Sequence, residues 1–276
     1  MLMKDLWWLI YSHEDIERNR SYIDLYFKYA SEKGKKLELL ESGSFSELPD
    51  KMPEAVINRS RNVYISKCFE EAGVRVYNSA KVAELGNDKL KAIVFAGALE
   101  IPVMRTLNER GDLAFPFVMK SRGGHGGKEV FLINNEEEYE SLKCIKSADG
   151  SDFIFQEMAS DTGKDLRIYT VGDEMIGSMM RISDTDFKSN YSLGGKAFVH
   201  ELTDEERGIA EKIIEALHPG HIGIDLIYDH GRPVFNELED AVGSRMLYRY
   251  TDTDAVRLYV DHIDRDIRKA YSPLTR

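Results

Sequence analysis

The sequence predicts a protein of the mixed α/β class, in which a small parallel α/β unit precedes an α+β region with antiparallel hairpins. In the first part, short apolar segments alternate with segments of helical periodicity that end at Gly34 and Gly73. This alternation is typical of a parallel sheet. In the second part, apolar runs follow one another across short polar turns at residues 172–173 and 230–231. Such turns are typical of antiparallel hairpins.

The first unit is expected to be an N-terminal domain over residues 1–85. Residues 6–12 form an aromatic and apolar run bounded by charge, which predicts a buried strand. Residues 15–33 carry apolar side chains at helical spacing before Gly34, which predicts a helix. Further strands are expected at 36–41, 54–60 and 74–79, and a further helix at 63–73.

The rest of the chain is expected to form two subdomains, residues 86–155 and 156–276. A helix over 87–100 is predicted to begin with Asn87 as its N-cap. Thr203 and Glu206 have the spacing of a capping box at the start of another helix. Other strands are expected at 115–120, 129–133, 153–158, 166–171, 174–182, 221–229 and 232–240, and helices at 134–147, 204–218 and 252–271.

The composition excludes several classes of protein. The chain has 276 residues, of which 42% are hydrophobic, and a formal net charge of −11. The acidic balance argues against sequence-independent nucleic-acid binding, which depends on Lys and Arg neutralising phosphates. The first apolar run is too short for a signal peptide, and no window approaches a membrane span. Two cysteines are too few for a disulfide framework or a thiolate metal site. We therefore expect a cytoplasmic protein without nucleic-acid or membrane partners.

A glycine-rich loop lies between two predicted strands in FPFVMKSRGGHGGKEVFLI, residues 115–133. Its glycines permit positive φ angles and close approach of the backbone to a ligand. The loop does not match GxxxxGK[ST], because Arg122 stands five residues before Gly127 and an acidic residue follows Lys128. It does not match GxGxxG between a strand and a helix either. A plain hairpin turn remains open, but the cations beside the loop, including Lys120, favour a flap over phosphate.

Three acidic residues of the last predicted hairpin point to a metal site. Residues two apart in a strand share a face, so Glu237 and Glu239 point to the same side of the sheet. Pairing across the turn at 230–231 brings Asp225 alongside them. Carboxylate oxygens suit Mg²⁺ or Mn²⁺, which often joins a few carboxylates to substrate phosphates. A solvated acidic face of an acidic protein is the alternative.

Several segments in order resemble the motifs of the ATP-grasp superfamily. They are NDKLKA, FPFVMK with its glycine loop, FQEM, KDLR, MMRI, DFKSN with the following glycines, GIDL and NELEDAVG. The similarity extends over nearly the whole chain and is greatest to RimK-type carboxylate–amine ligases. It implies an ATP-grasp fold with an N-terminal pre-ATP-grasp domain. It also implies an enzyme that uses ATP and Mg²⁺ or Mn²⁺ to join a carboxylate to an amine, through an acyl phosphate that the glycine loop covers.

The resemblance implies a role for each matching residue. The residues expected to bind ATP are Lys89 and Lys120 at the phosphates, Gly124, Gly126 and Gly127 in the flap, Gln156, Glu157 and Met158 at the adenine, Asp165 at the ribose, and Asn190. The residues expected near the phosphates or the reacting carboxylate are Arg167, Arg181 and Lys188. The expected metal ligands are Asp225, Glu237 and Glu239.

The sequence departs from the family pattern near the last metal ligand. Glu239 stands where the family usually has Asn, and the turn at 240–243 replaces a Ser-Pro-Gly-like turn that borders the acceptor site in relatives. Lys188 stands where close relatives have Arg. Arg245 after this turn is a candidate for holding a substrate carboxylate, and His125 is a candidate for covering the phosphates. For each, an ordinary surface residue is the alternative.

Two other functions stay open beside the ligase. A phosphotransferase on the same fold would place phosphate on a stable acceptor, and a nucleotide-binding protein would not turn over. The acceptor is a small metabolite, an amino acid or a peptide, and the sequence does not choose among them. Because dimers are common in the family, a homodimer is a further expectation from the resemblance.

Overall fold

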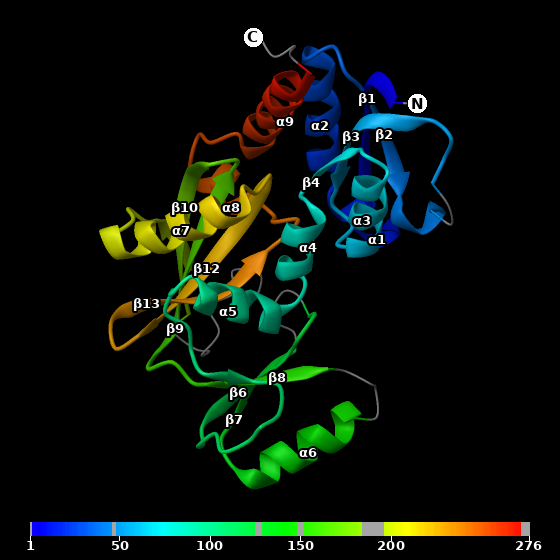
Figure 1. Ribbon diagram of the computed structural model, residues 1–276. Helices are drawn as coiled ribbons and strands as arrows, with labels where there is room; N and C mark the ends of the chain where they lie inside the picture. Colours follow the sequence, from blue (N-terminus) through cyan, green and yellow to red (C-terminus); the bar gives the residue numbers. More distant parts are fainter. Residues whose placement is uncertain (1, 46–47, 125–128, 148–151, 184–195, 272–276) are drawn as a thin grey trace.

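The computed structural model describes residues 2–45, 48–124, 129–147, 152–183 and 196–271. Three sheets follow one another through the molecule. The N-terminal unit lies at one end of the molecule. The sheet that contains residues 117–121 lies at the other end with helix α6 (Glu136–Ser147), and the five-stranded sheet lies between them (Figure 1). The expected mixed α/β class is confirmed.

The N-terminal unit contains the expected parallel sheet, with strand order β2-β1-β3-β4. Its elements are β1 (Leu2–Tyr11), α1 (His13–Arg18), α2 (Arg20–Glu32), β2 (Lys36–Glu41), η1 (Ser42–Ser44), β3 (Met52–Asn58), α3 (Val63–Glu71), β4 (Arg75–Tyr77) and α4 (Ala80–Gly86). Trp7 and Tyr26 belong to a core that also contains Val260 and Ile263 of the last helix, α9 (Ala255–Tyr271). Helix α9 lies beside α2 in Figure 1, so the end of the chain completes the core of its beginning.

The sheet at the opposite end has the strand order β5-β8-β6-β7 and is antiparallel. Its strands are β5 (Thr106–Leu107), β6 (Phe117–Ser121), β7 (Val130–Ile133) and β8 (Phe153–Glu157), and α6 (Glu136–Ser147) packs on it. Phe117, Tyr139 and Phe155 form the centre of the core between this sheet and α6. The predicted hairpin on either side of the glycine loop is confirmed by the pairing of β6 with β7.

The central sheet has the order β11-β10-β9-β12-β13. Its strands are β9 (Asp161–Val171), β10 (Glu174–Ile182), β11 (Lys196–Val199), β12 (His221–Asp229) and β13 (Arg232–Glu239). Leu166, Ile168 and Ile224 face a core shared with the helices α5 (Lys89–Ala98) and α7 (Asp204–Leu217). The capping box of Thr203 and Glu206 at the start of α7 is confirmed. The other face of this sheet carries the polar residues considered below.

Two sequence predictions about helices are wrong. The expected helix over 15–33 is divided at Asn19, whose side-chain amide donates to the Asp15 carbonyl oxygen at 2.8 Å. Asn side chains compete with the backbone for hydrogen bonds in this way and interrupt helices. Asn87 does not cap α5 but ends α4, where its side chain donates to the Ala83 carbonyl at 2.7 Å. Asp88 is the N-cap of α5.

The expected boundaries between domains, after residues 85 and 155, stay a prediction. Among the described residues, no helix has the length and apolar character needed to cross a membrane.

Candidate active site

The polar face of the central sheet is produced by the alternation of side chains along its strands. In β9, Leu166 and Ile168 are fully buried in the core, whereas Asp165 and Arg167 point to the opposite face. In β12, Asp225 lies between two core residues in the same way. The strands that build the core therefore also position the ionisable groups.

A β-bulge sets the direction of the acidic residues in β13. Asp225 pairs with Glu237, but the next residue of β12 pairs with Phe235, so Asn236 is an extra residue. The bulge allows Phe235 to remain in the core while Glu237 and Glu239 face Asp225. One oxygen from each of the three carboxylates lies within 4.8 Å of the others. The acidic cluster predicted from the sequence is therefore present.

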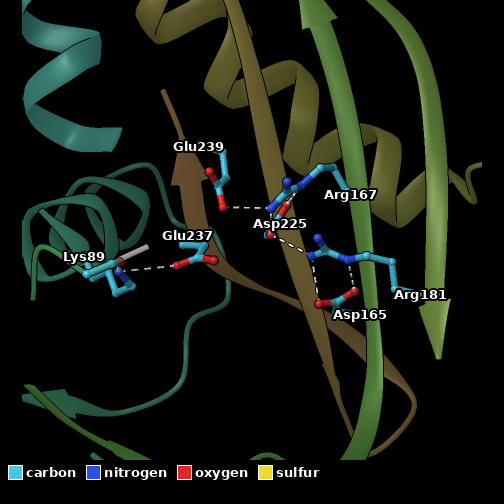
Figure 2. A network of polar contacts seen from close by, with 8 residues as sticks. Lys89, Asp165, Arg167, Arg181, Asp225, Glu237 and Glu239 are labelled. Carbon is cyan, nitrogen blue, oxygen red and sulfur yellow. Dashed lines mark hydrogen bonds and ion pairs between the residues drawn. The ribbon is translucent and has the colours of Figure 1, made fainter. Parts of the chain in front are cut away.

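Two buried arginines contact this cluster (Figure 2). Arg167 donates from Nε to Oδ1 of Asp225 at 2.7 Å, and from Nη2 to Oδ2 of Asp225 at 2.5 Å and to Glu239 at 2.9 Å. Arg181 donates from Nη2 to Asp225 at 2.8 Å. Burial raises the pKa of Asp225, but the two guanidinium groups outweigh this effect and lower it to about 2. Asp225 is therefore a carboxylate anion at neutral pH.

Asp165 is a further carboxylate in contact with Arg181, and it lines a pocket beside the acidic cluster that is described below. Arg181 donates from Nη2 to Oδ2 of Asp165 at 2.8 Å, so one guanidinium joins Asp165 to Asp225 (Figure 2). Burial raises the pKa of Asp165, and the positive charge of Arg181 opposes that rise. The carboxylate expected at the ribose thus lines the pocket while an arginine holds it in place.

Both predicted phosphate lysines line the same pocket, near Glu237. The Nζ of Lys89 lies 3.8 Å from an oxygen of Glu237 and also contacts the Gly124 carbonyl (Figure 2). Lys120 is 4% exposed and donates to Oδ1 of Asn236 at 3.0 Å. Burial lowers the pKa of Lys120 to about 8. Two cations and a carboxylate thus meet where the anionic end of a ligand is expected.

A pocket between the two antiparallel sheets brings together most of the predicted nucleotide residues. Its walls include Lys89, Lys120, Gly124, Gln156, Glu157, Met158, Asp165 and Glu237. The Gln156 side chain donates to the Thr106 hydroxyl at 2.8 Å, and the Glu157 amide donates to the Arg105 carbonyl at 3.0 Å. These contacts fix the strand end that is predicted to face the adenine.

Some residues that were predicted for the site are not found among the residues that line it. Gly126, Gly127, His125, Lys188 and Asn190 lie outside the described residues. Arg245 is exposed and begins the short helix α8 (Arg245–Tyr250), which was not predicted.

Two features of the site were missed in the sequence. Asn236 contacts Lys120 because the bulge of β13 displaces it, and no sequence signal indicates a bulge there. Asp88 binds Arg122 through Oδ1 and Oδ2, both at 2.8 Å, and so joins the start of α5 to the base of the glycine loop. The position of Asp88 directly before Lys89 indicates an N-cap of α5, but no sequence signal indicates the contact with Arg122.

Comparison with known proteins identifies the family. A family model described as a RimK-like ATP-grasp domain matches residues 88–263, well over half of the chain. The matched region contains the acidic cluster, both lysines and the strands of the pocket.

The curated relatives differ in how much of their length the chain covers. The uncharacterized protein MG011 of Mycoplasma genitalium is 27% identical over 85% of this chain and 83% of its own length. N-acetylaspartylglutamate synthase A of Homo sapiens is 35% identical over 50% of this chain but only 36% of its own length. A probable alpha-L-glutamate ligase of Xanthomonas euvesicatoria is 31% identical over 56% of this chain and 53% of its own length. The chain thus spans about half or less of the length of the latter two relatives.

Solved structures agree on the fold. A RimK domain ATP-grasp protein of Sphaerobacter thermophilus has a TM-score of 0.74 at 19% identity and covers 92% of this chain and 98% of its own. D-cycloserine synthetase DcsG has a TM-score of 0.72 at 14% identity, with 95% and 99% covered. The chain belongs to the RimK-like ATP-grasp family, and its named relatives include probable alpha-L-glutamate ligases.

Proposed function

We propose that this protein uses ATP to activate a carboxylate as an acyl phosphate and then joins the acyl group to an amine, releasing ADP and phosphate. The observation that carries the proposal is that Lys89, Lys120 and Glu237 line one pocket, and that Glu237 belongs to the cluster of three carboxylates. Both the attack on the phosphoryl group and its departure from ADP need positive charge at that point.

The position of each residue in the pocket indicates which part of the nucleotide it would contact. Lys120 comes from the strand before the flap and Lys89 from the first turn of α5, and both line the pocket, so we assign their ammonium groups to the phosphates. Asp165, Gln156, Glu157 and Met158 line the remainder of the pocket, which we assign to the nucleoside. Gly124 begins the flap that we expect to exclude water from the acyl phosphate.

The three carboxylates fit a divalent cation. They provide only oxygen atoms, which are the ligands that Mg²⁺ and Mn²⁺ prefer, and one oxygen from each lies within 4.8 Å of the others. Among the described residues, Glu237 makes no ion pair with an arginine. Its ion-pair partner is Lys89, whose Nζ lies 3.8 Å from Oε2 of Glu237. A bound Mg²⁺ would neutralise charge on the transferring phosphoryl group.

We further propose that the amine substrate is an amino acid. The names alpha-L-glutamate ligase and N-acetylaspartylglutamate synthase, which two kinds of relatives carry, make glutamate the first amine to test. The carboxylate is either a small acid or the end of a peptide.

The test is substrate-dependent release of ADP. The full chain is incubated with ATP, Mg²⁺, glutamate and pooled carboxylic acids or peptides, and products are identified by mass spectrometry. We expect ADP release that needs both the acid and the amine, with an amide product of matching mass. ADP release with a stable phosphorylated compound and no amide would instead establish a phosphotransferase. Nucleotide binding without any ADP release would support a binding protein.

A further inference from the structure

Asp240 is a buried carboxylate directly after the last expected metal ligand, and it contacts two distant parts of the chain. It is 2% exposed. Its Oδ1 accepts from the Asn78 side-chain amide at 2.7 Å, and its Oδ2 accepts from the Asn87 side-chain amide at 3.3 Å. Within the described ranges it has no ion pair. A buried carboxylate lowers stability unless nearby groups compensate it. Here the charges of Arg59 and Arg61 do so in part, and the two amides that also do so belong to distant segments of the chain.

The contact with Asn87 joins Asp240 to the segment that carries Lys89. Asn87 is itself fixed, because its amide also donates to the Ala83 carbonyl at 2.7 Å in the last turn of α4. Lys89 follows two residues later, and its Nζ lies 3.8 Å from Glu237. The hydrogen bond between Asn87 and Asp240 therefore connects the phosphate lysine to the strand end that carries the metal ligands.

Close backbone packing reinforces this connection. A Cβ atom on Gly86 would lie 2.7 Å from the backbone nitrogen of Asp240 and 3.0 Å from its Cα. Only glycine therefore allows the end of α4 to approach residue 240 this closely. The position of α4 is thus set against the backbone of Asp240.

The contact with Asn78 joins Asp240 to the strand of the first metal ligand. The Asn78 amide also donates to the His221 carbonyl at 2.9 Å, and the His221 amide donates back to the Asn78 side-chain oxygen at 2.8 Å. His221 begins β12, the strand that carries Asp225. The Asp240 carboxylate is therefore held between the start of β12 and the segment before Lys89.

We propose that Asp240 is a positioning residue that sets the separation between Lys89 and the carboxylate cluster through Asn87 and Asn78. The inference rests on the proposed function, because it assigns the phosphate end of a nucleotide to Lys89 and a divalent cation to Glu239. Loss of the Asp240 contacts displaces both Lys89 and Glu239. Nucleotide binding is therefore weaker without a divalent cation, because Lys89 is displaced, and also with the cation, because Glu239 is displaced.

The test compares nucleotide affinity in the full chain with and without a divalent cation. The non-hydrolysable analogue AMPPNP is titrated by calorimetry in Mg²⁺ and in EDTA, well below the unfolding midpoint of each variant. In Asp240→Asn, an amide of nearly the same shape replaces one acceptor oxygen and faces the donor amides of its partners. We expect the dissociation constant to rise about tenfold or more in both conditions, as for residues that support metal ligands.

Glu206→Gln is the matched control. Glu206 is also 2% exposed and hydrogen-bonded, but its partners are Tyr228 of β12, His200, and Thr203 at the N-cap of α7. We expect this variant to lower the unfolding midpoint while it leaves both dissociation constants within twofold of the wild type. A purely structural role of Asp240 would give the same pattern as the control and would overturn the inference.

Other outcomes are also decisive. Weaker binding in only one of the two conditions would show that Asp240 acts on one group alone, which contradicts the joint role. If Asp240→Asn does not fold, Asn87→Ala removes the same link from the other side, and unchanged affinity in EDTA would then overturn the inference. If the wild type does not bind AMPPNP in either condition, the proposed function fails, and the inference fails with it.

Discussion

Arg167 and Asp225 form two parallel hydrogen bonds, from Nε to Oδ1 at 2.7 Å and from Nη2 to Oδ2 at 2.5 Å. The same Nη2 contacts Glu239 at 2.9 Å. One buried guanidinium thus contacts two of the three carboxylates in the cluster, and Arg181 supplies a second positive charge at Asp225.

Arg167→Met should strongly destabilise the protein, because it leaves buried carboxylates without their cation. Breaking a buried ion pair costs about 3–5 kcal/mol of unfolding free energy. Mg²⁺ should restore part of this loss, since a ligand that binds only the folded state stabilises it. Urea unfolding with Mg²⁺ and with EDTA measures both effects. Arg232→Met removes an exposed pair with Glu205 and serves as the control, with little change expected. A small effect of Arg167→Met would show that the cluster does not need this cation.

Glu237→Gln should remove metal-dependent nucleotide binding. Glu237 is the member of the cluster that faces Lys89, and the amide is a weaker, neutral ligand. We expect a loss of Mg²⁺ affinity of at least about 100-fold, since residues that merely support a ligand already cost 10–100-fold. Calorimetric titration with Mg²⁺ and AMPPNP measures this, with the exposed Glu205→Gln as control. Unchanged Mg²⁺ dependence would exclude Glu237 as a ligand.

Nucleotide binding should take up protons near pH 8. Burial lowers the pKa of Lys120 to about 8 in the free protein, so part of the population is neutral at that pH. Phosphate favours the ammonium form and raises this pKa, so binding protonates the neutral fraction. Calorimetry in buffers of different ionisation enthalpy counts these protons. Above pH 8 the affinity should fall as the free protein loses the charge. Equal proton uptake in Lys120→Met would assign the effect to another group.

Asp88→Ala should destabilise the protein more than Asp88→Asn. Asp88 is the N-cap of α5 through the Lys91 amide, and it also pairs with Arg122. Asparagine keeps the cap but loses the charge, whereas alanine loses both. The difference between the variants should be about 1 kcal/mol, the usual contribution of an N-cap. Urea unfolding gives this difference directly, and equal losses would mean that the cap contributes nothing.

The hairpins and the acidic cluster were predictable because they depend on local patterns. Asp225 and Glu237 belong to strands joined by a short turn, so their proximity was predictable, whereas the bulge that makes them direct partners was not. The capping box at Thr203 is likewise a pattern within a few residues.

The arginine contacts were not predictable in the same way. Arg167 meets Asp225 because β9 pairs with β12, and Arg181 meets Asp165 because β10 pairs with β9. The first pairing joins strands far apart in the sequence, and no local pattern specifies it. The bulge at Asn236 and the short helix α8 depend on packing rather than on periodicity.

The most direct test of the account is to trap the acyl phosphate with hydroxylamine. The full chain is incubated with ATP, Mg²⁺, pooled carboxylic acids and hydroxylamine in place of the amine, and the mixture is analysed by mass spectrometry. We predict a hydroxamate whose mass names the carboxylate, with one ADP formed for each hydroxamate and neither product in Glu237→Gln. ADP formed together with a stable phosphorylated compound, and no hydroxamate, would contradict acyl-phosphate chemistry.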